Sequence, residues 1–393
     1  MQTDSIVILA ARRTPVGAFQ GALTAKTAPE LGAVAIRAAL ADSRLDPAEV
    51  DEVIMGCVLA AGLGQAPARQ AALGAGLGDA TPATTINKMC GSGMRAVMMA
   101  ADQILAGGAG VVVAGGFESM SNAPYLLPKA RGGYRMGHQQ VLDHMFHDGL
   151  QSPWDGQLMG CFAEATAAAY GLTRASQDAF AAESVRRAQA ASRGGAFAAE
   201  IADVVVQTRT GESRQGSDET PFSLDIDKIP SLKPAFKKDG TVTAASSSGI
   251  SDGAAALVLM RESRARARGL EPLARIAGYA SFAREPEWFT LAPVGAVGKL
   301  TGRLGWDAGT VDLYEINEAF AVVAMAAIRD LALDPAAVNV NGGACALGHP
   351  IGATGARILT TLIHSLGARR GRRGIASLCI GGGEATAIAV ERL

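Results

Sequence analysis

The stretch that decides the fold is LGAVAIRAALADSRLDPAEVDEVI at residues 31–54, because its pattern recurs at residues 292–315 as APVGAVGKLTGRLGWDAGTVDLYE. Each copy holds apolar residues at helical spacing, then a short turn, then Val-Asp at the start of a strand-like run. A fixed offset between two similar stretches is the signature of a repeated structural unit. The sequence therefore predicts that its two ends fold as copies of one unit.

The same offset also relates later parts of the two halves. It places Cys90 opposite Ile351, and each of these residues comes just before a run with helical periodicity. Each half then continues with a short strand that ends in glycines and with a last apolar strand. These strands are predicted at 111–116 and 254–260 in the first half and at 375–381 and 385–390 in the second. The order predicts an α/β fold made of two βαβαβ units.

The region between the halves has a different texture. Prolines, charged residues and polar turns are dense from about residue 119 to residue 245, around one amphipathic helix predicted at 174–191. Loops carried on a rigid scaffold often form binding sites. We therefore predict three units: an N-terminal half at 1–120 that is completed by 246–270, an inserted loop domain at 121–245 that covers the site, and a C-terminal half at 271–393.

Composition narrows the class of protein. The chain has 393 residues, of which 49% are hydrophobic and 5% aromatic, and 48 glycines, which is typical of a tightly packed α/β protein with more than one unit. Its net charge of -1 argues against a general nucleic-acid binder. The five cysteines are scattered and form no C-x-x-C pair, so we expect neither a disulfide framework nor a structural zinc site.

We identify no targeting signal in the sequence. The apolar runs are interrupted before they reach membrane-spanning length, and residues 1–10 lack the charged start and apolar core of a signal peptide. The last three residues, Glu391-Arg392-Leu393, are not a peroxisomal address. We expect a soluble, cytoplasmic protein that binds no membrane.

The first candidate catalytic residue is Cys90, in the stretch NKMCGSGM at residues 87–94. It follows an extended run at 84–86 and precedes a helix predicted at 94–105. A thiol at a helix start faces unpaired N–H groups and the positive end of the helix dipole, which lower a thiol pKa from about 8.5 towards neutrality. Most lone cysteines are small buried side chains, but this setting favours a nucleophile.

The second candidate is His349, in the stretch NGGACALGHPIGATG at residues 341–355. A lone histidine is more often a structural group than a catalyst. This one stands between glycine and proline, just before a glycine-rich helix start, and is poorly placed as an ordinary core residue. The repeat also places it at the same end of its half as Cys90, which favours a catalytic role.

Two further candidates lie at predicted strand ends. Asn317, in the stretch EINEAF at 315–320, stands where a strand ends and a helix begins, so it could act in the site or simply cap that helix. Cys379 ends a strand at a glycine triplet, in the stretch CIGGG at 379–383. Backbone N–H groups that are free there could stabilise an oxyanion.

Four motifs together resemble the thiolase family: residues 87–94, 317–320, 342–355 and 379–383. The resemblance runs along essentially the whole chain, from VILAARRTPVG at 7–17 to the end, and four ordered motifs are far more specific than any one alone. Within the family the chain most resembles the bacterial acetyl-CoA acetyltransferases. The resemblance implies two halves packed as a five-layered α-β-α-β-α core with an inserted loop domain. It also implies a homodimer or a homotetramer built as a pair of dimers.

The resemblance implies a reaction as well: the reversible condensation of two acetyl-CoA to acetoacetyl-CoA and CoA, through an acetyl-cysteine intermediate. Cys90 would be the nucleophile, His349 the base that takes its proton, and Cys379 the acid or base at the α-carbon. Asn317 (through a water molecule) and His349 would hold one thioester oxygen. The backbone N–H groups of Cys90 and Gly381 would hold the other.

Contacts of coenzyme A in the family match Met159, Ala244, Ser248, Ala319 and Phe320. Two departures concern the nucleotide end of this substrate. Leu158 stands where many relatives have histidine, and no arginine near residues 219–222 matches the one that often stacks on the adenine. How the adenine is held is therefore left open. The CoA thioesters are substrates, and no separate cofactor is implied.

Three of the five histidines, His138, His144 and His147, lie close together in the sequence. A metal site is one interpretation. Their spacing and the mixed local charge instead favour a loop near a subunit contact or near the CoA phosphates. We therefore predict no metal site.

Other activities fit the motifs less well. A decarboxylating enzyme of the related ketoacyl-synthase group would need a second catalytic histidine or asparagine and would not explain Cys379. A catalytically silent acyl-CoA-binding protein would normally have lost Cys90, His349 or Cys379, and all three are present. A broader-chain 3-ketoacyl-CoA thiolase of fatty-acid β-oxidation stays open, because the sequence fixes neither the acyl chain length nor the direction of the reaction in fatty acid metabolism.

Overall fold

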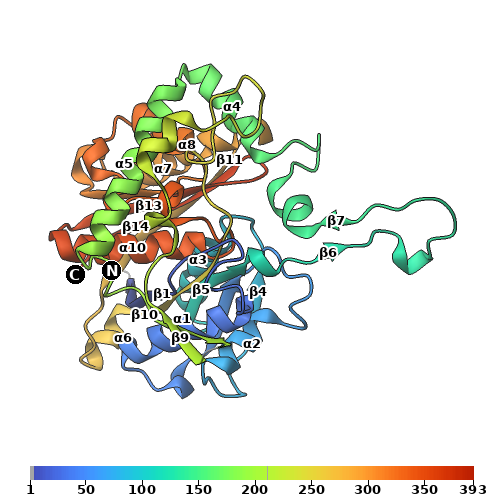
Figure 1. The fold of residues 1–393 in the computed structure, drawn as a ribbon. Helices are drawn as coiled ribbons and strands as arrows, with labels where there is room; N and C mark the ends of the chain where they lie inside the picture. The colour runs from blue at the N-terminus through green and yellow to red at the C-terminus, as the bar shows by residue number, and fades with distance from the viewer. Residues whose placement is uncertain (1–3, 210) are drawn as a thin grey trace.

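The two predicted repeats fold alike. In the computed structural model, which describes residues 4–209 and 211–393, the first repeat forms helix α1 (Ala28–Ser43), a 3-10 turn (Pro47–Glu49) and strand β3 (Glu52–Gly56). The second forms helix α7 (Ala292–Leu304), a 3-10 turn (Ala308–Thr310) and strand β12 (Leu313–Ile316) (Figure 1). Residues 1–3 of the predicted N-terminal half and residue 210 of the predicted insert lie outside the described residues.

Local chemistry explains where these helices begin and end. Thr27 and Glu30 form a capping box at the start of α1, and Arg44 ends the helix in the left-handed conformation. Helix α7 has Pro293 in its first turn, where a missing N–H costs nothing, and it ends at the left-handed Gly305. The helices therefore begin and end at residues whose backbone preferences are visible in the sequence.

The strands follow one path of paired neighbours in the order β12-β13-β14-β11-β1-β10-β5-β3-β4, with the short β2 also paired to β10. The pairs β12–β13, β3–β4 and β3–β5 are parallel, and the other pairs are antiparallel. The remaining strands on the path are β1 (Ile6–Arg13), β2 (Gly17–Ala18), β4 (Ala83–Ile86), β5 (Val111–Ser119), β10 (Ser251–Arg261), β11 (Ala274–Ala283), β13 (Arg373–Ile380) and β14 (Glu384–Arg392). The halves meet at β1 and β11, where Val7 pairs with Arg275 and Ile8 pairs with Ala274.

Successive side chains along a strand face opposite sides of the sheet, and the helices they contact define the layers of the fold. In β10, Ala256 and Val258 pack with the outer helices α1 and α2 (Pro67–Gly74), whereas Leu257 and Leu259 face the opposite way. They pack on α3 (Ser92–Leu105) and α10 (Thr354–Arg369), which lie between the two halves of the sheet. Helices α7 and α8 (Ala321–Asp330) cover the far face of the C-terminal half. The predicted five-layered α-β-α-β-α fold is confirmed.

One predicted strand end is wrong. The strand after the helix in the N-terminal half was expected to end in glycines at residue 116, but β5 runs through both glycines to Ser119. A Cβ on Gly115 would lie 2.0 Å from the carbonyl oxygen of Ala255, and one on Gly116 would lie 2.1 Å from that of Gly352. These glycines permit close packing inside the sheet and do not end the strand.

The middle of the chain wraps around the two halves. A narrow hairpin with strands β6 (Tyr125–Leu126) and β7 (Leu142–Asp143) extends away from the body (Figure 1). Helices α4 (Met159–Tyr170) and α5 (Arg174–Arg193) lie over the C-terminal half, and the predicted helix at 174–191 is confirmed.

The remaining elements are short: α6 (Glu262–Ala267), α9 (Ala344–Leu347), the hairpin of β8 (Val204–Thr208) and β9 (Gly211–Gln215), and a π-helical turn (Met145–Leu150). Short 3-10 turns lie at Met120–Asn122, Ala130–Gly132, Thr220–Phe222, Ile226–Ser231, Pro286–Leu291 and Pro335–Ala337. Among the helices that the structure describes, none is long and apolar enough to cross a membrane.

Candidate active site

Cys90 lies on a tight turn between β4 and α3. Met89 adopts a left-handed φ of 48°, and its N–H donates to Oδ1 of Asn87 (2.9 Å). The hydroxyl of Ser92 accepts the N–H of Lys88 (2.8 Å) and donates to the carbonyl of Met89 (2.6 Å). These bonds hold the non-glycine residue in its unusual conformation and present the following cysteine to the pocket.

The predicted electrostatic effect on this cysteine is wrong in its net direction. Burial raises the pKa of the Cys90 thiol to about 11, although the backbone N–H groups of Gly381 and of Cys90 itself act to lower it. The helix start does provide donors, as expected, but the sulfur is enclosed by protein and its charged form loses hydration. Cys90 therefore needs a base to form its thiolate.

His349 is placed to be that base. Its Nδ1 lies 2.6 Å from the hydroxyl of Thr354, and that hydroxyl donates to the carbonyl of Pro350 (2.9 Å). Because a hydroxyl has one proton, Nδ1 must then be the protonated nitrogen and Nε2 carries the free lone pair. Nε2 is buried and has no hydrogen-bond partner among the described residues, and His349 lines the same pocket as Cys90.

The charge state of this histidine fits a base. Burial, and then the nearby cation of Arg357, lower the pKa of His349 to about 3. The imidazole is therefore neutral at physiological pH and can accept a proton. Sequence reasoning did not single out Thr354, although it lies in the quoted glycine-rich motif.

Cys379 is the second-to-last residue of β13 and lines the same pocket as Cys90. Burial, and then the charge of Cys90, raise the pKa of the Cys379 thiol well above its usual value. The two residues following Gly381 have left-handed φ values of 98° and 89°, which suits glycine. This conformation turns the chain so that the N–H of Gly381 points at the sulfur of Cys90.

Asn317 is not a helix cap. Helix α8 begins only at Ala321, and its N-cap residue is Phe320, which makes no side-chain capping bond. Both polar atoms of the Asn317 side chain are buried, and within residues 4–209 and 211–393 neither has a hydrogen-bond partner. The backbone N–H of Asn317 donates to the carbonyl of Ser377 (3.0 Å). Burying an amide without a hydrogen-bond partner costs free energy. The Asn317 side chain is therefore a candidate for hydrogen bonding to a substrate or a water molecule.

A pocket of about 340 Å³ collects the predicted residues. Of the ten site residues predicted from the sequence, nine line it: Cys90, Met159, Ala244, Ser248, Ala319, Phe320, His349, Cys379 and Gly381. Asn317 is not among the lining residues; it follows directly after β12 and comes two residues before Ala319, which lines the pocket. Leu158, one of the two departures from the family pattern, also lines this pocket.

The segments that carry the predicted CoA contacts are tied to one another. The N–H and the hydroxyl of Ser248 both lie 3.0 Å from the carbonyl of Ala319. Phe236 and Phe320 meet edge to face, with ring centroids 5.8 Å apart, and a Cβ on Gly160 would lie 2.3 Å from the Phe236 ring. The pocket therefore has a narrow, largely apolar wall beside Cys90.

The nucleotide end of the predicted CoA site has no arginine at the expected place. Residues 219–222 contain no arginine; Pro221 is buried, and Phe222 is half exposed beneath the guanidinium of Arg193 (5.1 Å from the ring centroid). The departure noted in the sequence is therefore also a departure in the structure.

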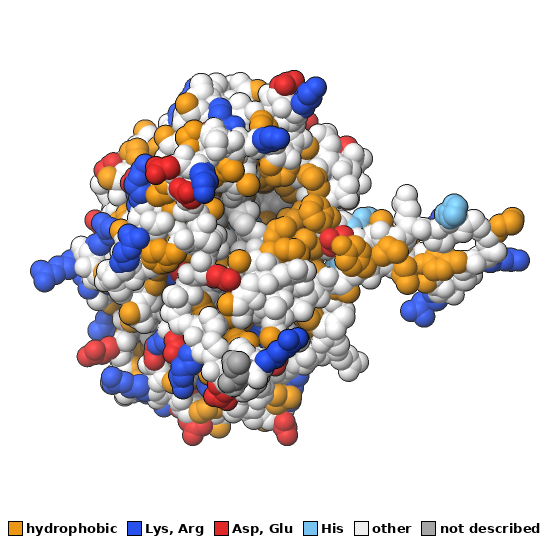
Figure 2. Space-filling view, in the orientation of Figure 1, with side chains coloured by type: hydrophobic (Ala, Val, Ile, Leu, Met, Phe, Trp, Pro, Cys, Tyr) orange, Lys and Arg blue, Asp and Glu red, His pale blue; other side chains and the backbone are white. Residues whose placement is uncertain are grey.

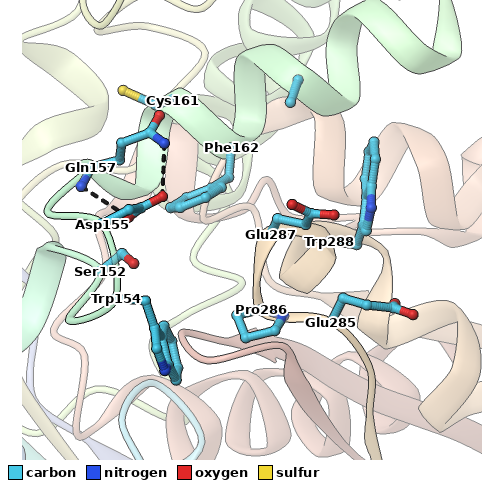
Figure 3. Close-up of a pocket in the computed structure, with 11 residues that line it drawn as sticks. Ser152, Trp154, Asp155, Gln157, Cys161, Phe162, Glu285, Pro286, Glu287 and Trp288 are labelled. Atoms are coloured by element: carbon cyan, nitrogen blue, oxygen red, sulfur yellow. Dashed lines mark hydrogen bonds between the residues drawn. The ribbon is translucent and has the colours of Figure 1, made fainter.

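A middle hollow of about 280 Å³ adjoins this pocket and shares Met159 and Gly381 with it. The outer one, of about 540 Å³, shares Trp154 and Pro286 with the middle one but contains none of the predicted site residues. Figure 3 shows that residues 152–162 form one wall of this outer hollow and residues 285–288 the other, with the carboxylates of Glu285 and Glu287 on the second wall.

The histidines at 138–147 do not gather around one point. His144 is buried, and its Nδ1 lies 2.6 Å from Oδ2 of Asp148, while the N–H of Ala61 donates to its Nε2 (3.4 Å). Within residues 4–209 and 211–393, no group of three or more histidine, cysteine, aspartate or glutamate side chains could hold a metal ion.

Comparisons with known proteins agree with this geometry. Two family descriptions match the chain: "Thiolase, N-terminal domain" over residues 6–263 and "Thiolase, C-terminal domain" over residues 270–392. An acetyl-CoA acetyltransferase of Pseudomonas aeruginosa is 50% identical over 99% of this chain and 100% of its own length. One of Escherichia coli is 51% identical over 98% of this chain and 99% of its own.

A solved structure is equally similar in fold. The crystal structure of the Bacillus anthracis acetyl-CoA acetyltransferase superposes with a TM-score of 0.97 and is 43% identical in sequence. The match covers 100% of this chain and 99% of the other. The fold is thus that of this solved structure from end to end.

Proposed function

The chain belongs to the thiolase family, and on that premise we propose that it is an acetyl-CoA C-acetyltransferase, which converts two acetyl-CoA to acetoacetyl-CoA and CoA in a reversible reaction. The observation that carries the proposal is the convergence of Cys90, His349 and Cys379 on one pocket. Two of these residues come from the C-terminal half and one from the N-terminal half.

In the first half-reaction, Nε2 of His349 takes the proton of the Cys90 thiol, and the thiolate attacks the thioester carbon of acetyl-CoA. The bond to the CoA sulfur breaks, and the proton passes from His349 to that sulfur as CoA leaves. The neutral state and fixed tautomer of His349 support this role. The raised pKa of Cys90 makes the base necessary.

The negative oxygen of each tetrahedral intermediate needs donors that are already in place. The N–H groups of Cys90 and Gly381 both act on the Cys90 sulfur, so we assign them to the oxygen of the acyl group attached there. We assign Asn317, through a water molecule, and His349 to the thioester oxygen of the second substrate. The unpartnered amide of Asn317 supports this assignment, and His349 can donate to that oxygen only while Nε2 carries a proton.

The second half-reaction forms a carbon–carbon bond. We propose that Cys379 first loses its thiol proton to solvent and that the thiolate then takes an α-proton from the second acetyl-CoA. The resulting carbanion attacks the acetyl group on Cys90, and the Cys90 sulfur leaves as a thiolate that takes up a proton from solvent. In the reverse direction the Cys379 thiol protonates the departing carbanion. Burial is the main cause of the raised pKa of Cys379 and persists in the acetyl-enzyme; acetylation of Cys90 prevents only the further increase that a Cys90 thiolate would cause.

Steady-state assays test the proposed activity. The purified protein should cleave acetoacetyl-CoA with CoA and should condense acetyl-CoA, with no added metal or cofactor. Failure to turn over acetoacetyl-CoA in either direction would overturn the proposal. The same assays with 3-ketohexanoyl-CoA and 3-ketooctanoyl-CoA measure the preference for acyl chain length.

The second candidate function is that of a 3-ketoacyl-CoA thiolase for longer chains. Phe289 and Leu158 line the reactive pocket and restrict its size, which favours a short acyl group. The adjoining 280 Å³ hollow beyond Met159 is the observation that favours longer chains. A higher kcat/KM for the six- or eight-carbon substrate than for acetoacetyl-CoA would select this second function.

We further propose that the protein is a homodimer or a homotetramer. Strand β4 lies at the end of the strand path, and its residues are partly exposed, so its edge is available for pairing. The β6–β7 hairpin carries exposed apolar side chains away from the body, among them Tyr125 (68% exposed) and Met136 (90% exposed) (Figure 2). Both surfaces suit contacts with further copies of this chain.

The cellular setting is also a proposal. We infer that the reaction takes place in the cytoplasm and serves fatty acid metabolism, because it interconverts two-carbon and four-carbon CoA thioesters. Subcellular fractionation of the native source with an antibody to the protein would test the location.

A further inference from the structure

Glu118 is a buried carboxylate that the mechanism described above does not use. It lies near the end of β5 with no exposed surface. Its carboxylate accepts the backbone N–H groups of Val58 (3.0 Å), Leu59 (3.0 Å) and Gly352 (2.8 Å). The thiol of Cys57 lies 3.6 Å from the same carboxylate. One side chain thus holds two segments that are nearly 300 residues apart in the sequence.

The carboxylate is not part of an ion pair in the described residues, and its burial has a cost. Burial raises the pKa of Glu118 to about 7, while the donors of Leu59, Val58 and Gly352 act to lower it. A buried carboxylate is tolerated when several hydrogen bonds replace its hydration. The cost of burying Glu118 is thus offset by its hydrogen bonds to two separate segments, which these bonds hold in place.

The bond to Gly352 joins the two halves of the molecule. Gly352 follows His349 by three residues and belongs to the C-terminal half, whereas Glu118 and Cys90 belong to the N-terminal half. A Cβ on Gly352 would lie 2.7 Å from Oε2 of Glu118 and 2.8 Å from the carbonyl of Phe117. The loop that carries the base is therefore pressed against the strand that carries the carboxylate.

The hydrogen bonds from Val58 and Leu59 to Glu118 hold a segment that packs near Cys90. Val58, Leu59 and Ile351 form one apolar cluster, and Met89 and Cys90 pack against it. Glu118 therefore fixes both the loop after His349 and a segment that supports Cys90.

We propose that Glu118 is a positioning residue for the reaction: it sets the distance between Nε2 of His349 and the sulfur of Cys90 by tying their loops together across the interface of the halves. The inference rests on the proposed function. A misplacement of about 1 Å between reacting groups can cost roughly 10² in rate. The substrate contacts at Ser248 and Phe320 lie on other segments, so binding depends little on this tie.

The test is the Glu118→Gln variant. Glutamine has the same shape, but its amide NH₂ would face a backbone N–H donor, so at least one tie is lost. We expect kcat to fall by about 10², in condensation and in thiolysis alike, with KM changed by less than about threefold. Thermal unfolding and circular dichroism check that the variant is folded.

Alkylation of Cys90 by iodoacetamide gives a readout that a merely structural role would not move. In the wild type, His349 assists the thiolate, so alkylation should be appreciable at neutral pH. In Glu118→Gln the base is displaced, and the rate should instead keep rising with pH towards the high pKa of an unassisted thiol. An unchanged pH profile of alkylation, or an unchanged kcat, would overturn the proposal.

Glu164→Gln is the matched control. Glu164 is also buried, and it accepts the N–H groups of Thr241 (2.9 Å) and Val242 (2.8 Å) beside the predicted CoA segment. It does not tie the loops of Cys90 and His349, so this variant should raise KM more than it lowers kcat. If both variants lose kcat equally, the effect is general and the proposal fails.

A second variant guards against loss of folding. Glu118→Asp keeps the charge but is one methylene shorter, so it should keep part of the ties and show an intermediate kcat. If neither variant folds, Glu118 is a stability residue and the proposal is wrong. An inactive wild type would instead contradict the proposed function itself, so the two failures are distinct.

Discussion

At the scale of single residues, the reactivity of Cys90 does not reside in the cysteine alone. Enclosure of the sulfur outweighs the lowering effect of the nearby N–H groups, so the free thiol has a raised pKa. The N–H groups at the helix start do not lower the pKa of the thiol enough, and the neutral imidazole of His349 provides a base, Nε2, that can take its proton. Nucleophile and base therefore act as one unit.

The pH dependence follows from the lowered pKa of His349. An ordinary imidazole is largely protonated below pH 6, whereas His349 stays neutral until the pH approaches about 3. The rate of acetylation at low acetyl-CoA should therefore show no acidic limb near pH 6.5. A stopped-flow pH profile that falls with an apparent pKa near 6.5 would contradict the assigned charge state.

The same shift makes a prediction about stability. His349 has a lower pKa in the folded state than in the unfolded chain, where it lies near 6.5. The unfolded state therefore binds more protons between about pH 6.5 and 3, and the contribution of His349 to stability is lost as the pH falls through that window. Urea unfolding of a His349→Gln variant should accordingly depend less on pH in that range than unfolding of the wild type.

The roles of Cys379 and Cys90 can be distinguished experimentally, because we assign the two residues to different half-reactions. Cys379→Ser keeps the size of the side chain, but its hydroxyl is far less acidic than a thiol. The variant should still form acetyl-enzyme at Cys90, while losing both condensation and exchange of the α-hydrogens of acetyl-CoA. Deuterium loss from labelled acetyl-CoA measures this exchange. Normal exchange in the variant would return Cys379 to a packing role.

At the scale of elements, the site is built from the ends of strands and the starts of helices. Cys90 lies between β4 and α3, Asn317 between β12 and α8, and Cys379 at the end of β13. Two ties across the halves reinforce this arrangement: the bond between Glu118 and Gly352, and the ion pair between Lys88 and Glu384. The elements themselves are held by the five-layered core.

Asn317 lies on the connection between β12 and α8, and its buried side chain has no hydrogen-bond partner among the described residues. Asn317→Ala should slow turnover by about 10²–10³ with little change in binding, as expected for the loss of an oxyanion donor. Since Asn317 does not cap α8, the thermal stability should fall only slightly. A variant that kept kcat and only raised KM would make Asn317 a binding contact.

Much of this arrangement could be predicted from the sequence. Short-range patterns were sufficient for α1, α3, α5 and α7, and the order of the motifs placed nine predicted residues on one pocket. The direction of the Cys90 pKa shift could not be predicted, because burial depends on segments far away in the chain. The end of β5 was missed because its glycines serve packing against Ala255 and Gly352, which no local pattern reveals.

At the scale of the whole molecule, duplication explains why the site lies where the halves meet. Each half brings a helix start to the centre, α3 in one and α10 in the other, and these helices pack together. On this basis we retain as a proposal the division into an N-terminal half completed by β10, an inserted region and a C-terminal half. Glu118 was not visible as a site residue in the sequence, because its role depends on this meeting of halves.

The projecting hairpin gives the prediction for the assembly. Replacement of residues 127–141 by a short glycine–serine turn removes Leu127, Met136 and Val141, which are more than half exposed. If the hairpin joins two dimers, light scattering should show a tetramer for the wild type and a dimer for the variant. The reactive pocket lies in the body, so turnover of acetoacetyl-CoA should persist. An unchanged assembly would assign the hairpin another role.

The central claim is that one enzyme molecule carries an acetyl group on Cys90 between the two half-reactions. The most direct measurement is mass spectrometry of the protein after brief exposure to acetyl-CoA, acid quenching and proteolysis. We predict a single added acetyl group on the peptide that contains Cys90, and its absence in a Cys90→Ala variant. An acetyl group on the peptide with Cys379, or none on an enzyme that turns over, would contradict the account.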